Sequence, residues 1–206
     1  MKSHACVVVI GGGVVGVSTL YHLAKKGWSD VVLVERKELT SGSTWHAAGL
    51  LPLFNMSYSV GQIHKYSVKF YQELQEETGM DVGFRNVSNI RLASNQDRMD
   101  EFRQYAGVAS TIGVQVDFLT PEQVLDYWPM ANIEGLVGAI RHPQDGYIQP
   151  ADLTQALARG ARDRGAEIYR NTAVTAITRS DDGLWIVSTD KGDITCEHVV
   201  SASGNY

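Results

Sequence analysis

Residues 5–16 read ACVVVIGGGVVG, a run of apolar residues followed at once by a cluster of glycines. A helical segment comes next, then a second apolar run that ends at Glu35, and then the polar segment SGSTWH at residues 41–46. This order of strand, glycine turn, helix, strand and acid is typical of a dinucleotide-binding unit. The first fifty residues therefore predict a Rossmann-like α/β fold.

Each glycine of the G-x-G-x-x-G pattern meets a physical need. Gly11 permits the tight turn from strand to helix, Gly13 lets the backbone approach a pyrophosphate, and Gly16 lets the helix lie close to its strand. The amides of Val14 and Val15 then lie at a helix N-terminus, where unpaired N–H groups and the helix dipole favour a diphosphate. We expect these amides to be free to bind it.

Glu35 follows Gly16 by nineteen residues, at the end of the second apolar run. At this position a carboxylate accepts hydrogen bonds from both ribose hydroxyls and repels a 2′-phosphate. A glycine-rich turn in an unrelated protein is the alternative for an isolated motif of this kind. These residues indicate a dinucleotide but leave FAD and NAD both open.

Residues 38–50, ELTSGSTWHAAGL, resemble the flavin-attachment segment of the dimethylglycine dehydrogenase and sarcosine dehydrogenase family. Similarity to that family extends over essentially the whole chain, through residues 76–79, 82–84, 90–93, 145–150 and 157–162. The resemblance implies FAD, joined covalently to His46 through its 8α-methyl group. The order of parallel strand, meander and returning strand near the C-terminus resembles the two-dinucleotide-binding flavoproteins, which implies that the backbone of Val174 contacts the adenine end and that Gly204 lies against the cofactor.

The expected cofactor-binding set combines the motif and the resemblance. It comprises Gly11, Gly13, Val14, Val15, Gly16, Glu35, Arg36, Gly42, Ser43, Thr44, Trp45, His46, Ala47, Ala48, Gly49, Leu50, Val174 and Gly204. Taken without the family, a histidine such as His46 beside a tryptophan in a loop is more often a satisfied surface or core residue. Val174 and Gly204 could equally serve strand packing.

The resemblance implies oxidation of an N-methyl amine such as dimethylglycine or sarcosine by hydride transfer to the flavin. The products would be the demethylated amine and formaldehyde, or methylene-tetrahydrofolate in a full-length protein, with electrons passing to an electron-transfer flavoprotein or to oxygen. Two alternatives stay open: a non-catalytic flavin-binding fragment and an NAD-dependent Rossmann dehydrogenase. Tyr21 and Lys25 have the Tyr-x-x-x-Lys spacing of short-chain dehydrogenases, but they lie on the helix that follows the glycine loop.

Composition excludes other classes. The 206 residues carry a net charge of −5, and neither this charge nor the short pair Lys25 and Lys26 gives the basic surface that binds nucleic acid. No apolar stretch is long enough to span a membrane. Cys6 and Cys196 lack the CxxC spacing, which favours a reducing compartment: the cytoplasm, or the mitochondrial matrix in a eukaryote.

Periodicity predicts an FAD-binding domain of residues 1–52 and 150–206, with a parallel sheet and a three-stranded antiparallel meander. Residues 53–149 are expected to form a partial α+β insertion on the substrate side. The expected helices lie near residues 63–74, 99–112, 121–127 and 153–161. The expected strands are 5–10, the run ending at 35, 87–93, 136–141, 167–170, 174–179, 184–189, 193–196 and 199–203.

No acid–base residue is assigned, because the tyrosine and histidine that contact substrate in the family would fall after Tyr206. We therefore expect this chain alone not to turn over. His142 and Tyr147 flank a turn and are expected to be a loop histidine and a core tyrosine. A substrate carboxylate would need an arginine, for which Arg85, Arg91 and Arg141 are equal candidates.

Overall fold

Two units make up the chain, whose residues 1–205 are described by a computed structural model. The first unit consists of Met1–Ala48, Glu73–Gly83 and the chain from Gln149 onward, and the second consists of Gly49–Gln72 and Phe84–Ile148. The last turns of helix α2 (Tyr58–Thr78) thus belong to the first unit, although the sequence placed them in the insertion. Each unit is described by itself.

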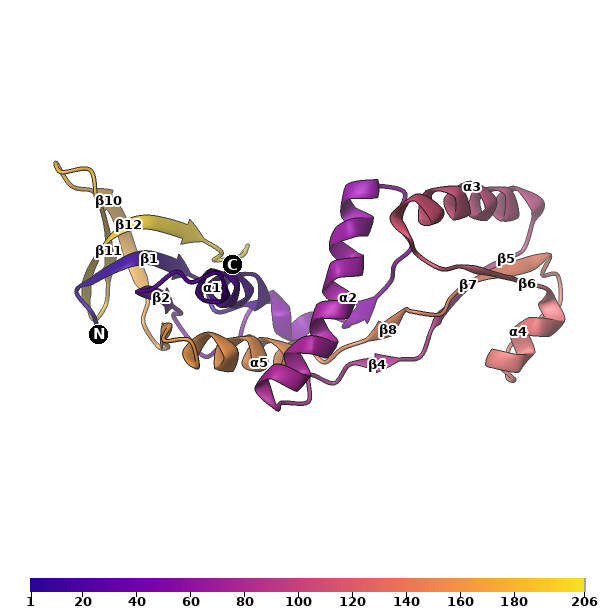
Figure 1. The fold of residues 1–206 in the computed structure, drawn as a ribbon, viewed down its shortest axis with the longest axis horizontal. Coiled ribbons are helices and arrows are strands. Elements are labelled where there is room, and N and C mark those ends of the chain that lie inside the picture. Colours follow the sequence, from indigo (N-terminus) through magenta and orange to yellow (C-terminus); the bar gives the residue numbers. More distant parts are fainter. Residues whose placement is uncertain (206) are drawn as a thin grey trace. The chain divides into compact units, whose positions relative to one another are not determined.

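A six-stranded sheet forms the centre of the first unit (Figure 1). Its order is β10-β11-β12-β1-β2-β9. Strands β12, β1, β2 and β9 run parallel, and β10, β11 and β12 form an antiparallel meander. The bounds are β1 His4–Ile10, β2 Val31–Val34, β9 Glu167–Tyr169, β10 Val174–Arg179, β11 Trp185–Thr189 and β12 Gly192–Ser201. The α/β fold with parallel strands and a meander is confirmed.

Strand β12 differs from its prediction. The sequence suggested two strands, 193–196 and 199–203, whereas the structure has one strand of ten residues. From Gly192 to Cys196 it pairs antiparallel with β11, and from Thr195 to Ser201 it pairs parallel with β1. No glycine or proline separates the two halves, so the backbone continues extended and joins the meander to the parallel sheet.

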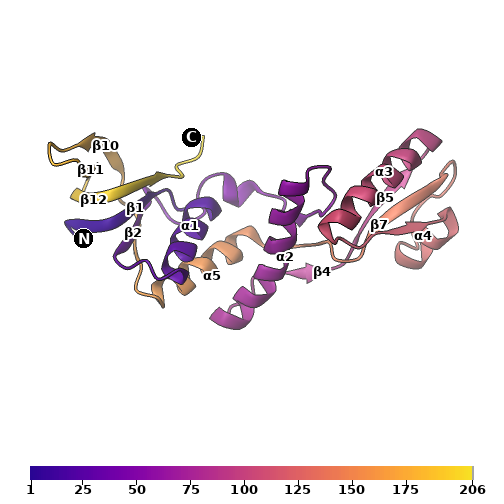
Figure 2. The ribbon, with the colours of Figure 1, turned by 45° about the horizontal axis from the view of Figure 1, so that its top comes forward.

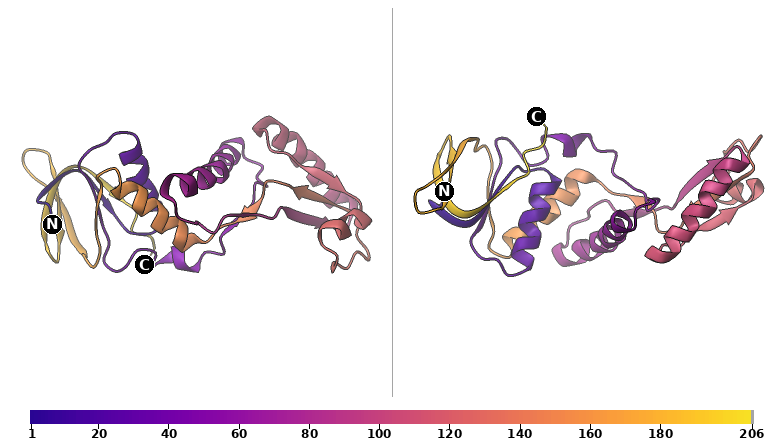
Figure 3. Two further views of the ribbon diagram at one scale, coloured as in Figure 1. Left: turned by 60° about the horizontal axis from the view of Figure 1, so that its bottom comes forward. Right: turned by 90° about the horizontal axis from the view of Figure 1, so that it is seen from above.

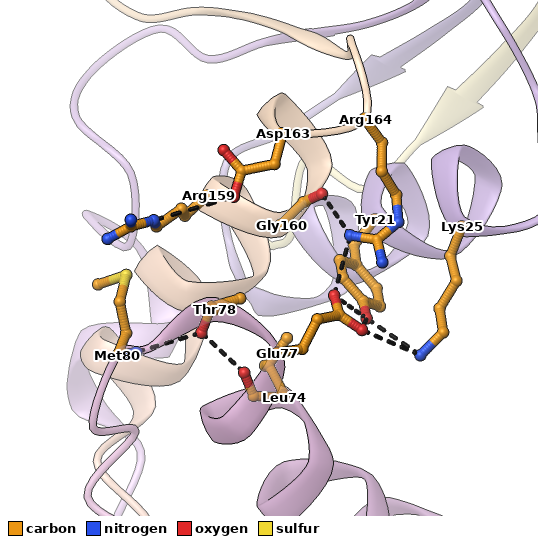
Figure 4. Close-up of polar contacts among 10 residues, drawn as sticks. All are labelled: Tyr21, Lys25, Leu74, Glu77, Thr78, Met80, Arg159, Gly160, Asp163 and Arg164. Atoms are coloured by element: carbon orange, nitrogen blue, oxygen red, sulfur yellow. Dashed lines mark hydrogen bonds and ion pairs between the residues drawn. The ribbon is translucent and has the colours of Figure 1, made fainter.

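Helices α1 (Val14–Lys25) and α5 (Pro150–Arg162) pack against each other beside this sheet (Figure 2). Gly160 makes the approach possible, because a Cβ there would lie 2.7 Å from the ring of Tyr21. The Tyr21 hydroxyl donates to the Glu77 carboxylate, at 2.8 and 2.9 Å from its two oxygens. Lys25 and Arg164 form ion pairs with the same carboxylate (Figure 4). This cluster fastens the end of α2 to α1 and α5.

The second unit contains two small antiparallel sheets, β5-β7-β6 and β3-β8-β4. Their strands are β3 Leu50–Leu51, β4 Arg85–Asn86, β5 Asn89–Ala93, β6 Asp117–Leu119, β7 Gly138–His142 and β8 Gly146–Tyr147. Helix α3 (Gln96–Ile112) packs on β5 and β7 (Figure 3), and helix α4 (Pro121–Tyr127) packs on β6 and β7. The capping box of Thr120 and Gln123 begins α4, as its sequence pattern indicates.

The expectations for His142 and Tyr147 are wrong. His142 is fully buried in β7, on the side that faces Phe54 and Tyr105, with ring-centroid separations of 5.8 and 5.4 Å. Tyr147 is 44% exposed and lies in the two-residue strand β8. Burial and the nearby charge of Arg91 lower the pKa of His142 to about 4.

The expected strand 87–93 begins two residues later than predicted, at Asn89. Ser88 has a positive φ of 63°, so the extended conformation of the backbone is interrupted between β4 and β5. The amide of Ser88 donates to the carbonyl of Asp145 at 2.8 Å. Asp145 is itself buried, and its Oδ1 accepts from the amide of Leu53 at 2.9 Å. Burial raises the pKa of Asp145 to about 6.

Within residues 1–205, no helix is both long and apolar enough to cross a membrane.

Candidate functional site

A cavity of about 360 Å³ lies in the first unit, where the glycine loop after β1 meets the ends of β2 and β12. The N-terminus of α1 and the 3₁₀ turn Ser43–His46 complete its wall. Ligands of open α/β sheets bind at the carboxyl ends of parallel strands, which is where this cavity opens. Its lining residues are Gly11, Gly12, Gly13, Val14, Val15, Glu35, Arg36, Lys37, Ser41, Gly42, Ser43, Thr44, His46, Ala202, Ser203 and Gly204.

Two positions of the glycine loop exclude a side chain. Gly11 has a φ of +113°, and a Cβ on it would lie 2.3 Å from the carbonyl oxygen of Ala202. A Cβ on Gly16 would lie 2.0 Å from the carbonyl oxygen of Gly11. Both distances are shorter than any real contact, so the turn and the seating of α1 on β1 require glycine. The loop therefore presents backbone atoms to the cavity.

The carboxylate of Glu35 is held by backbone amides at the cavity edge. Its Oε2 accepts from the amide of Gly12 at 2.6 Å, and its Oε1 accepts from the amide of Lys37 at 2.8 Å. The backbone of Glu35 is also fixed, by hydrogen bonds to Tyr169 and Thr172 of 2.9 and 2.8 Å. A carboxylate has about four acceptor sites, so Glu35 keeps capacity for the hydroxyls of a ligand.

The amides at the start of α1 are not all free. The amide of Val14, expected to be available to a ligand, donates instead to Oγ1 of Thr44 at 2.9 Å. Thr44 is only 8% exposed and belongs to the 3₁₀ turn. The amide of Val15 has no partner within the helix, because it lies in the first turn. The sequence could not reveal the Thr44 contact, because its partners are thirty residues apart.

His46 lies on the wall of the same cavity with its side chain exposed. Its Nδ1 is 3.2 Å from the carbonyl oxygen of Gly42. A carbonyl only accepts, so in the neutral imidazole this contact places the proton on Nδ1 and the lone pair on Nε2. Trp45, its neighbour, is 70% exposed and does not line the cavity.

Some expected residues lie elsewhere. Gly16 lies behind the loop, and Ala47 and Ala48 are absent from the cavity lining. Gly49 and Leu50 belong to the second unit. Val174 lines an adjoining cavity of about 160 Å³, whose wall also includes Gly11, Glu35, Arg36, Thr172 and Ser203.

Five lining residues were missed by the sequence analysis: Gly12, Lys37, Ser41, Ala202 and Ser203. Four of them directly adjoin an expected residue, and Ala202 adjoins Ser203 just after the end of β12, so proximity in the sequence was the available signal. Among residues 1–205 no group of three or more His, Cys, Asp or Glu side chains could hold a metal ion.

The three candidate arginines belong to other environments. Arg141 pairs with Asp117 at 2.9 Å, and Arg85 donates to the carbonyl of Phe84 at 2.8 Å. The guanidinium of Arg91 lies 4.2 Å from the ring centroid of Phe54, and its buried Nε has no hydrogen-bond partner in the described part of the chain. None of the three lines the glycine-loop cavity.

Comparison with known proteins agrees with this geometry. Residues 6–206 match the family described as FAD dependent oxidoreductase. The chain is 42% identical over 203 residues to dimethylglycine dehydrogenase, mitochondrial, of Rattus norvegicus, covering 98% of this chain and 24% of that protein. It is 35% identical to the pyruvate dehydrogenase phosphatase regulatory subunit, mitochondrial, of Mus musculus, covering 100% of this chain and 24% of that protein. The chain thus spans about a quarter of the length of these curated relatives.

Among solved structures, the chain is similar to L-proline dehydrogenase from P. horikoshii, with a TM-score of 0.91 and 28% sequence identity. The similarity covers 98% of this chain and 53% of that one.

Proposed function

This chain belongs to the family of FAD-dependent oxidoreductases, and from that premise we propose that it binds FAD in the glycine-loop cavity and oxidises an N-methyl amine. Dimethylglycine and sarcosine are the proposed substrates, because the rat relative at 42% identity is named a dimethylglycine dehydrogenase and the attachment segment resembles that family. The observation that carries the proposal is one cavity lined by the glycine loop, Glu35 and the exposed imidazole of His46.

The residues fit a dinucleotide. Backbone at Gly11 and Gly13, where side chains are excluded or crowded, lets a diphosphate approach the N-terminus of α1. Glu35 offers acceptors to ribose hydroxyls, and Val174 lines the neighbouring cavity for the adenosine end. When bound, FAD supplies the acceptor for the hydride of the amine's methyl group. The chain's own residues bind and orient it.

We assign covalent attachment to Nε2 of His46, because Nδ1 carries its proton toward Gly42. His46 would hold the flavin through Nε2, whose lone pair is the nucleophile, and the bound flavin would supply its 8α-methyl group as the carbon attacked. Dioxygen would be the oxidant that takes up the two electrons, together with one proton from the methyl group and one from the imidazole.

Downstream steps are proposed for the whole protein. The oxidised amine is hydrolysed to the demethylated amine and formaldehyde, or gives its carbon to tetrahydrofolate, and the electrons pass to an electron-transfer flavoprotein or to oxygen. We also propose a reducing location, the cytoplasm or the mitochondrial matrix, since Cys6 and Cys196 are both free thiols.

A second function is supported by one observation. The mouse relative at 35% identity is named as a regulatory subunit, which favours a chain that binds flavin without catalysis as the alternative. Substrate-dependent reduction separates the two, because an inert binder keeps its flavin absorbance when dimethylglycine is added.

The test compares the whole protein, purified, with its His46→Ala variant. We expect flavin absorbance bands in both, flavin fluorescence on a denaturing gel only in the unmodified protein, and anaerobic bleaching by dimethylglycine or sarcosine. Loss of all flavin from the unmodified protein on denaturation would refute attachment. Absence of flavin binding by both proteins, with either added FAD or cellular FAD, would refute the proposed function.

A further inference from the structure

Thr44 connects the two halves of the cofactor site. Its Oγ1 accepts from the amide of Val14, the first helical residue of α1, at 2.9 Å. Gly13 makes room for this contact, because a Cβ there would lie 3.1 Å from Oγ1. The hydrogen bond therefore links the phosphate loop to the 3₁₀ turn that carries His46.

The turn is a single short hydrogen-bonded unit. The amide of Trp45 donates to the carbonyl of Gly42 at 3.2 Å, and the amide of Ala47 donates to the carbonyl of Thr44 at 3.3 Å. The Nδ1 of His46 is bonded to the same Gly42 carbonyl. Because three residues span the turn from Thr44 to His46, fixing the side chain of Thr44 also limits where the imidazole can lie.

The Thr44 hydroxyl has a hydrogen-bond donor without an acceptor among residues 1–205. A hydroxyl has one donor and two acceptor lone pairs, and the Val14 amide occupies one of the lone pairs. Residues 1–205 supply no acceptor for the O–H of Thr44, although the residue is 8% exposed and lines the cavity. A negatively charged oxygen in the cavity would satisfy this donor beside the positive end of α1.

We propose that Thr44 is a positioning residue that couples diphosphate binding to flavin attachment. Its hydroxyl accepts from the Val14 amide and donates its own proton to the diphosphate, which holds the His46 turn in register with the phosphate loop. This inference rests on the proposed FAD site. It goes further because it gives the Thr44 hydroxyl, which takes no part in bond formation, the role of positioning the imidazole of His46.

The test uses Thr44→Val, which keeps the branched shape but removes the hydroxyl, and Thr44→Ser, which keeps the hydroxyl. Apoprotein is mixed with saturating FAD, and attachment is followed as fluorescence on denaturing gels. We expect Thr44→Val to slow attachment about tenfold or more, because a hydrogen bond to a charged group is lost. Thr44→Ser should attach within about twofold of the unmodified rate, and the control Thr19→Val, whose hydroxyl bonds to Val15 on the solvent side of α1, should be unchanged.

A second measurement tests the diphosphate contact without flavin chemistry. ADP and adenosine are titrated into each apoprotein, and Thr44→Val should weaken ADP binding about tenfold while leaving adenosine binding unchanged. Attachment by Thr44→Val at the unmodified rate, or equal losses for ADP and adenosine, would overturn the coupling. If Thr44→Ser is as slow as Thr44→Val, the hydroxyl is not responsible. If the unmodified protein binds neither FAD nor ADP, the proposed function itself fails.

Discussion

Replacing Glu77, a single polar side chain, should lower the free energy of unfolding of the first unit substantially. The single proton of the Tyr21 hydroxyl, on a fully buried residue, is shared between the two oxygens of the Glu77 carboxylate, at 2.8 and 2.9 Å. The carboxylate also pairs with Arg164 at 2.9 Å and Lys25 at 3.4 Å (Figure 4). Burial works against the charge of Glu77, but the hydrogen bonds from Tyr21 and Arg164 prevail and lower the pKa of Glu77. The carboxylate is therefore ionised where the protein is folded.

The magnitude follows from these contacts. Leaving the buried Tyr21 hydroxyl without its acceptor costs about 1–3 kcal/mol. The two ion pairs add only about 0.2–1 kcal/mol each, since the Arg164 and Lys25 side chains are 31% and 38% exposed. We expect Glu77→Ala to lower the free energy of unfolding by about 3 kcal/mol, or the melting temperature by roughly 6–12 °C for a chain of this size.

The assay is urea unfolding of a double-mutant cycle with Tyr21→Phe, with Glu76→Ala as the control for an exposed neighbouring glutamate. The coupling energy between positions 21 and 77 should be about 1–2 kcal/mol, and Glu76→Ala should change stability by less than about 0.5 kcal/mol. A lowered folded pKa means that the contribution of Glu77 is present above its unfolded pKa and is lost as the pH falls through the folded value. Additive effects of the two substitutions at pH 7 would refute the reasoning.

Three further outcomes are expected. Gly16→Ala should weaken FAD binding at least tenfold and destabilise the first unit by about 2 kcal/mol, because its Cβ would lie 2.0 Å from a backbone oxygen. The control Gly107→Ala should bind FAD normally, because a Cβ there has no atom within 4 Å. Equal FAD titrations for the two variants would contradict this. FAD at a hundredfold excess over its dissociation constant should raise the free energy of unfolding by about 2.7 kcal/mol, so a melting temperature independent of FAD concentration would argue against the site. In the Asp145→Asn variant, the free energy of unfolding should rise by about 2 kcal/mol as the pH is raised from 4 to 6.5, measured by urea unfolding. The raised folded pKa of Asp145, about 6, gives stability that is present below pH 4 and lost as the pH rises. The lowered folded pKa of His142, about 4, gives the opposite slope, and of this pair only His142 titrates in the variant. A pH profile of the variant that matches the unmodified protein would disprove this opposition.

The fold of the first unit was predictable because its signals are local. Apolar runs of four to seven residues, glycines at turns and helical spacing specify β1, α1, β2 and the meander without reference to distant residues. The second unit was harder, since β3, β6 and β8 have two or three residues each and exist only through their partners. Strands this short carry no periodicity of their own.

The site was predictable to the extent that backbone geometry determines it. The glycine positions and Glu35 follow from what a strand-to-helix turn and its neighbouring strand can offer a dinucleotide. The hydrogen bond between Val14 and Thr44 did not follow, because it depends on how the segment after β2 returns over the loop. The burial of His142 was missed for a related reason: a histidine beside a turn looks exposed until the opposing helix α3 is in place.

The Tyr-x-x-x-Lys spacing shows why a motif must be read with its contacts. Tyr21 and Lys25 do approach each other, at 3.2 Å between hydroxyl and ammonium, as they would in a short-chain dehydrogenase. Yet the hydroxyl donates to Glu77 and is fully buried, so it faces no cavity and has no proton to give a substrate. Burial also raises the pKa of Tyr21, the reverse of what a tyrosine acting as a base requires. The same spacing that suggested nicotinamide chemistry therefore serves to anchor α2 in a flavin-family fold.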